Sequence, residues 1–203
     1  MLSYINFADN LSAWFGKAFG WLIILMTAGM SYEVFVRYLL NTPTPWSLDV
    51  SFIMYGTLFM MGGAYTLSQG GHVRGDFIYR LWPARVQAWV DLVLYLFFFF
   101  PGVIALIFSG WKYASRSWAY GEVSVSSPAG VPIYQFKTVL VAAGILLFIQ
   151  GIAQIFRCVL CIRDGFWYEA EVDVEETEVM LIKQVAEQGL DKVAQQVSDI
   201  RKD

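Results

Sequence analysis

Residues 88–111 read AWVDLVLYLFFFFPGVIALIFSGW, and Asp91 is the only charged side chain among them. A helix rises about 1.5 Å per residue, so about 20 mostly apolar residues cross the roughly 30 Å hydrocarbon core of a bilayer. This stretch is long and apolar enough to do so, although Pro101 and Gly102 interrupt it weakly. It therefore predicts a transmembrane helix.

Three further apolar stretches have the same character, at residues 17–39, 47–68 and 134–160. The whole chain is 57% hydrophobic and only 15% charged, whereas soluble domains carry roughly 25% charged residues. The first stretch follows Lys17 as a signal peptide would, but it continues to Leu40 without a small-residue cleavage site. We therefore expect an all-α membrane protein with four transmembrane helices.

The distribution of basic residues in the loops predicts how the chain is threaded, because short cytoplasmic loops are enriched in Lys and Arg. The connection between the second and third spans carries Arg74, Arg80 and Arg85 against the single acid Asp76. The connection NTPTPWSLD before the second span has neither Lys nor Arg. This bias places both termini in the cytoplasm.

The charge balance changes abruptly after Arg163, which divides the chain into a membrane domain (1–163) and an acidic cytoplasmic tail (164–203). Lys and Arg outnumber Asp and Glu by 10 to 6 in the first part and are outnumbered 4 to 11 in the second. This distribution argues against nucleic-acid binding, which requires a concentrated basic patch. Apolar residues recur every three or four positions from Val179 to Ile200. They predict an amphipathic cytoplasmic helix, with a loosely ordered tail as the alternative.

The sequence lacks the residues that most catalytic or metal sites need. His72 is the only histidine, so neither a histidine-rich metal site nor paired haem ligands can be assembled. Cys158 and Cys161 have the spacing of a redox motif, and a four-helix membrane thiol-redox enzyme is the alternative function. Free cysteines in apolar stretches are more often small buried residues. We expect no enzyme, no catalytic or substrate-binding residue, no metal and no bound cofactor.

Polar and small residues inside the spans are candidates for helix contacts. Glu33 and Arg37 lie four residues apart on the first span, so they share a face and can form an ion pair. The fourth span carries two amides and two glycines at helical spacing: Gln150, Gln154, Gly144 and Gly151. Small residues permit close helix approach, and amides can hydrogen-bond across the contact. These residues predict either packing within the chain or an interface with another subunit.

Two segments resemble a known family. RYLLNTPTPWSLD (37–49) after the first span and GGHVRGDFI (70–78) after the second resemble the small, DctQ-like membrane subunit of tripartite ATP-independent periplasmic (TRAP) transporters. Tyr120-Gly121-Glu122 in the third loop also fits, and the resemblance spans about residues 15 to 162. The positions that carry it in the first two segments are Arg37, Tyr38, Asn41, Trp46, Asp49, Gly70, His72, Val73 and Asp76.

This resemblance implies a scaffold subunit in the bacterial inner membrane. Its partners would be membrane lipid, a large permease subunit and a periplasmic protein that delivers an organic acid. The large subunit would drive uptake with a sodium or proton gradient, and this chain would hold no substrate. The resemblance also makes Gly70, His72, Arg74 and Asp76 a structural turn, and it assigns an outer loop or partner contact to four residues of the first loop region: Arg37, Asn41, Trp46 and Asp49.

Overall fold

The computed structural model describes residues 1–69 and 82–167. The chain divides into two units at Ala170 and Glu171, and the second unit lies outside the described residues, as does the expected C-terminal helix. The described helices are α1 (Leu2–Gly20), α2 (Leu22–Leu39), α3 (Ser47–Ser68), α5 (Ala84–Leu94), the π-helical segment η1 (Tyr95–Phe99), α6 (Phe100–Tyr120) and α7 (Tyr134–Asp164). No strand occurs within these ranges, only an isolated bridge between Val123 and Pro132.

Four helical stretches are long and apolar enough to cross a membrane, which confirms the prediction of an all-helical protein with four spans. They run over Leu2–Leu39, Ser47–Ser68, Ala84–Tyr120 and Tyr134–Asp164. The second span has the predicted bounds, and the fourth begins at the predicted residue. The third is longer than predicted at both ends, because its helix continues past the apolar stretch into polar turns.

The first helical stretch begins at Leu2, whereas the apolar pattern predicted a start near Lys17. The reason is the composition of α1, in which Ser3, Asn6 and Asp9 lower the mean hydropathy. α1 is amphipathic, and it buries Ile5, Ala8 and Ser12, which recur every three or four residues. Only one face of α1 is apolar, so its residues give no continuous apolar stretch. The hydropathy pattern therefore did not predict this helix.

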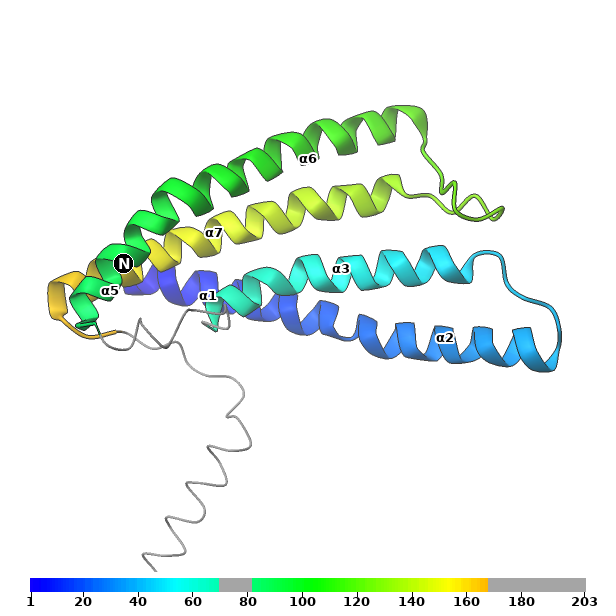
Figure 1. Cartoon of the computed structure of the whole chain (residues 1–203), viewed down its shortest axis with the longest axis horizontal. Helices are drawn as coiled ribbons and strands as arrows, with labels where there is room; N and C mark the ends of the chain where they lie inside the picture. The colour runs from blue at the N-terminus through cyan, green and yellow to red at the C-terminus, as the bar shows by residue number, and fades with distance from the viewer. Residues whose placement is uncertain (70–81, 168–203) are drawn as a thin grey trace, which may run out of the picture. The chain divides into compact units, whose positions relative to one another are not determined.

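The spans lie side by side in the order α2, α3, α7 and α6 (Figure 1). α1 packs against both α3 and α7, and α5 packs against the last part of α7. Ile5 and Ala8 of α1 meet Ala153 and Leu160 of α7 in one apolar cluster. α7 is thus the central helix, which explains why a larger share of its residues is buried than in the other spans.

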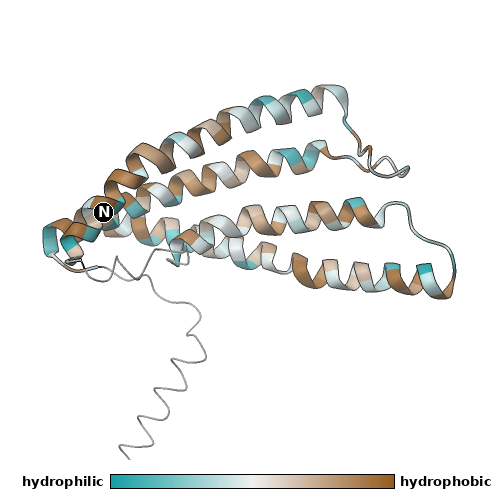
Figure 2. Ribbon diagram, viewed as in Figure 1, coloured by the Kyte–Doolittle hydropathy of each residue, from teal (hydrophilic) through white to brown (hydrophobic). Residues whose placement is uncertain are grey.

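Charged residues mark both ends of the spans. α7 has no charged side chain between Lys137 and Arg157, a separation of about 30 Å at 1.5 Å per residue. The third span has none between Asp91 and Lys112, a similar length. Figure 2 shows the same pattern, with hydrophilic residues concentrated toward the helix ends. These uncharged segments match the thickness of a bilayer core.

The third span passes through its proline without breaking. Proline has no backbone N–H, and its ring crowds the preceding turn, so it normally kinks a helix. Here Pro101 lies in the first turn of α6, and the five residues of η1 before it form a π-helical segment. The weak interruption expected at Pro101 and Gly102 is therefore a local change in helical winding within a continuous span.

Candidate functional site

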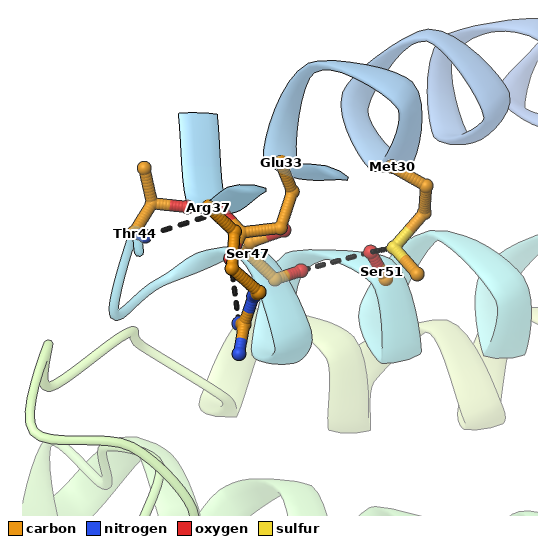
Figure 3. Close-up of polar contacts among 6 residues, drawn as sticks. All are labelled: Met30, Glu33, Arg37, Thr44, Ser47 and Ser51. Atoms are coloured by element: carbon orange, nitrogen blue, oxygen red, sulfur yellow. Dashed lines mark hydrogen bonds and ion pairs between the residues drawn. The ribbon is translucent and has the colours of Figure 1, made fainter. Parts of the chain in front are cut away.

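Polar side chains gather at two places, which we name by their position. The loop end is the end of the spans that carries the connections 40–46 and 121–133, and the tail end is the opposite end, where α7 terminates. At the loop end, Arg37 donates two hydrogen bonds to Glu33, at 2.6 and 3.0 Å (Figure 3). The backbone N–H and hydroxyl of Thr44 donate to the other oxygen of Glu33. The expected Glu33–Arg37 pair therefore also holds the first connection against α2.

The residues around this pair show why the chain turns here. Asn41 has a φ of +52°, a left-handed conformation that asparagine tolerates better than most residues. The N–H groups of Leu40 and Thr42 both donate to Val36 O, which satisfies the end of α2. Trp46 caps the backbone of α3 and is 40% exposed. Asn41 and Trp46 thus lie on the surface of the loop end, beside the Glu33 pair.

Asp49 connects the two loops of this end. Its side chain is buried, and it accepts hydrogen bonds from the hydroxyls of Ser124, at 2.7 Å, and Ser127. Both serines belong to the connection between α6 and α7. The Ser124 hydroxyl also accepts a hydrogen bond from the backbone N–H of Ser126. The carboxylate therefore fixes a loop that is 75 residues away in the sequence.

Replacing Asp49 by Asn is expected to loosen the 121–133 connection. The amide keeps one acceptor oxygen, so one serine hydroxyl loses its acceptor, at a cost of about 1 kcal/mol. Faster deuterium uptake in peptides covering residues 121–133, with uptake in α7 unchanged, is the expected result. Ser51→Ala is the matched control, because Ser51 lies on the same helix and its hydroxyl bonds to Met30 and Ser47 and not to the 121–133 connection. Equal uptake in Asp49→Asn and wild type would show that the carboxylate does not order the loop.

A second ion pair joins the same loop to α7. Lys137 is buried and donates to the Glu122 carboxylate, while its ammonium lies 3.8 Å from the centre of the Tyr113 ring. The aromatic face adds a cation–π contact to the ion pair. The hydrogen bond from Lys137 lowers the pKa of Glu122 below its ordinary value of 4.5. The ionised form of Glu122 is therefore favoured by folding.

This shift predicts an acid-sensitive contact. A carboxylate whose pKa is lower in the folded state stabilises the fold above its unfolded pKa, and the contribution disappears as the pH falls through the folded value. The thermal unfolding midpoint of the wild type should exceed that of Glu122→Gln at pH 7. The difference should shrink below about pH 4.5. A difference that stays constant down to pH 3 would contradict the assignment.

The tail end holds a buried polar network, of which the sequence indicated Gln150 as a contact residue but neither Asp9 nor Arg157. Arg157 of α7 donates to the Asp9 carboxylate of α1 and, at 3.2 Å, to Ser68 O of α3. Gln150 donates to Asp9 at 2.8 Å and accepts from Ser12 at the same distance. This network joins three helices at one point. A lone arginine in the fourth span and a lone aspartate in the first 16 residues were the only signals available.

The two amides and two glycines of the fourth span all make contacts within the chain. Gln154 donates to Leu67 O at 2.8 Å. A Cβ placed on Gly144 would lie 2.8 Å from Ile107, and one on Gly151 would lie 2.5 Å from the Phe99 ring. Because real side chains cannot approach so closely, both positions need glycine for α7 to meet the third span at this distance.

The remaining predicted residues give no catalytic arrangement in the described structure. Cys158 and Cys161 are both buried and outside any disulfide, and Cys161 donates to Ala84 O at 3.6 Å. Thiol exchange needs an accessible thiolate, so this placement is unfavourable for it. No group of three or more potential metal-binding side chains occurs in residues 1–69 and 82–167. The predicted turn residues Gly70, His72, Arg74 and Asp76 lie outside the described residues.

The buried charged and amide groups of the described spans bond to other side chains or to the backbone of the chain, which is an arrangement that fixes helices and loops in place. The comparison with known families agrees with such a role. Residues 26–161 match the model of the family described as "Tripartite ATP-independent periplasmic transporters, DctQ component". The chain belongs to the DctQ family. No individual curated protein matched the sequence.

Membership in the DctQ family confirms the resemblance noted in the two loop segments. The matched region begins within α2 and ends within α7, so it covers part of the first span, the second and third spans and most of the fourth. It leaves out α1, which carries Asp9 and Ser12 of the tail-end network. DctQ proteins are components of a transporter, so the thiol-redox enzyme that the two cysteines suggested is not supported. The chain is therefore a multi-pass membrane component of a TRAP transporter.

Proposed function

We propose that this DctQ chain is the small scaffold subunit of its transporter and supports a large permease subunit. In this proposal a periplasmic binding protein delivers an organic acid, and the large subunit moves it with a sodium or proton gradient. The small subunit holds neither substrate nor cofactor. Family membership favours this assignment over a transporter that acts alone.

The observation that carries the proposal is how the spans use their polar groups. Six buried charged or amide side chains of the described spans all bond within the chain: Glu33, Asp49, Lys137, Gln150, Gln154 and Arg157. A transport pathway needs polar groups that are available to a passing solute, as in the broken helices of secondary transporters. Groups already engaged in helix contacts support a fixed scaffold instead.

We further propose that the tail end faces the cytoplasm and the loop end the periplasm of a bacterial inner membrane. Arg85 lies at the start of α5, and Arg74 and Arg80 precede it in the chain, which follows the enrichment of basic residues on the cytoplasmic side. The exposed Asn41 and Trp46 then face the periplasm, where they contact the delivery protein or the large subunit. A photo-crosslinker at position 46 that captured neither protein would argue against that contact.

Purification and uptake together test the proposed function. The full chain carrying an affinity tag, expressed with the genes that neighbour its own, should retain a large multi-span permease. Deleting the chain should abolish uptake of the organic acid, and restoring it should recover uptake. The proposal fails if the permease transports normally without the chain, or if the chain purifies without any large membrane partner.

A further inference from the structure

Two cations at the loop end differ from their neighbours in having no counter-ion within residues 1–69 and 82–167. Arg37 pairs with Glu33, and Lys137 pairs with Glu122. The side chains of Lys112 and Arg116 on α6 are exposed, and neither has an ion pair or hydrogen bond among the described residues. The negative charge that balances them must therefore come from outside the described part of the chain.

Lys112 and Arg116 share the outer face of α6. They lie four residues apart, so their Cβ atoms are about 6 Å from each other on a helix. α6 buries Gly110, Ala114 and Ser117 where it packs on α7, and a rotation of 100° per residue places the two cations roughly opposite these positions. α6 lies at one edge of the row of spans (Figure 1). The cation pair thus faces the surroundings of the chain.

The depth of this pair in the membrane follows from the uncharged segment beside it. Residues 92–111 carry no charge and cover about 30 Å, the thickness of the hydrocarbon core. Lys112 is the first charged residue after that segment, and Arg116 is one turn farther out. Both cations therefore lie at the level of the lipid headgroups.

The exposed side chains of α6 change from charged to aromatic within one helical turn of the cation pair, toward the membrane centre. Phe108, one turn deeper than Lys112, is 68% exposed, and Trp111 is 66% exposed. Tryptophan at a span end is typical of the boundary between headgroups and acyl chains. Phe108 lies within about 40° of Lys112 around the helix, so the same face offers cations at headgroup level and an exposed aromatic ring one turn below them. This order of charged and apolar groups matches that of a phospholipid.

We propose that Lys112 and Arg116 bind the phosphate of a membrane phospholipid, with an anionic phosphatidylglycerol-type lipid preferred and its acyl chain lying along Phe108. Two cations about 6 Å apart can both donate to one phosphodiester. An anionic lipid is preferred over a zwitterionic one, because its headgroup brings a net charge of -1 to the two cations, with no ammonium group to repel them. A carboxylate from a partner protein would fit the cations, but it would not explain the aromatic surface below them.

A photoreactive phosphatidylglycerol tests this proposal on the full chain, purified with whatever partners remain bound. Peptide mass spectrometry should find the label in the segment 104–120, and unlabelled phosphatidylglycerol should compete for it. The variant Lys112→Gln/Arg116→Gln should bind the competitor about thirtyfold more weakly, because each cation near a membrane surface strengthens the attraction of anionic lipid about fivefold and two cations are removed. Lys17→Gln/Arg163→Gln removes the same charge elsewhere and should leave labelling of this segment unchanged.

Two other outcomes would overturn the proposal. Equal labelling of the double variant and the wild type would mean that this face meets only bulk lipid. Loss of a protein partner from the double variant, with lipid labelling retained, would assign the cations to a partner carboxylate. An unchanged thermal unfolding midpoint in the double variant would show that neither result arises from a folding defect. Labelling does not depend on transport, so its result is independent of the uptake assay.

Discussion

Replacing Arg157 by Met is expected to cost about 3 kcal/mol in the free energy of unfolding, the largest effect of any single change considered for this protein. Breaking a buried ion pair by removing one partner leaves the other charge uncompensated, which typically costs about 3–5 kcal/mol. We expect the low end of this range because the Asp9 side chain is 21% exposed, so water can partly solvate the carboxylate that loses its partner. The change also removes the donor to Ser68 O, so the hold of α7 on the end of α3 weakens as well.

Cys158 and Cys161 provide a built-in measurement of this effect. Both thiols are buried on α7 next to Arg157, and neither forms a disulfide. Alkylation by N-ethylmaleimide should become markedly faster in Arg157→Met, because local opening exposes them. Arg163→Met is the matched control, since its side chain is 70% exposed and its pair with Asp164 is local. The double variant Asp9→Asn/Arg157→Met should recover part of the loss. The thiols pack against Ala88 of α5, so unchanged alkylation in Arg157→Met would show that the pair does not keep this end of α7 packed.

Substituting Gly151 by Ala is expected to destabilise the contact between α7 and the third span by about 1–3 kcal/mol, the range for overpacked cores. The new methyl group would lie 2.5 Å from one Phe99 ring carbon and 3.3 Å from the Phe100 ring. Phe99 is packed edge-on against both Tyr95 and Phe100, so it cannot rotate away easily. The thermal unfolding midpoint in detergent should fall.

Gly62→Ala is the control for this substitution. A Cβ at Gly62 meets nothing within 4 Å, although the residue lies in the middle of a spanning helix. Alanine has a higher helix propensity than glycine, so this variant should be neutral or slightly more stable. If both variants lowered the midpoint equally, the loss would reflect glycine itself and not the approach of Phe99.

The apolar stretches of the sequence predicted the spans well where a helix is surrounded by lipid. The second span was placed at its observed bounds because 47–68 is mostly apolar and carries a single charged residue, Asp49. α1 was missed because its stability comes from packing on α3 and α7, and a helix with one polar face gives no continuous apolar signal. The helix of the third span extends past both predicted bounds for another reason, because its terminal turns are polar and hydropathy marks only the apolar part.

The polar contacts were predictable only when they were local. Glu33 and Arg37 lie four residues apart, so helical geometry alone indicated their pairing. Asp9 and Arg157 are 148 positions apart, and Asp49 lies 75 positions from Ser124. No periodicity links residues at such distances, and either partner could have been satisfied by headgroups or water. The glycines of α7 were identified as contact positions, but their partners Ile107 and Phe99 became evident only in the fold.

The central claim is that these four spans form a fixed support and do not carry the cargo. Reconstitution in lipid vesicles tests it most directly, with the chain alone, with its permease alone, and with both together. We predict that an imposed sodium or proton gradient drives accumulation of the organic acid only when both subunits are present with the binding protein. Accumulation in vesicles that contain this chain as the only membrane protein would contradict the account.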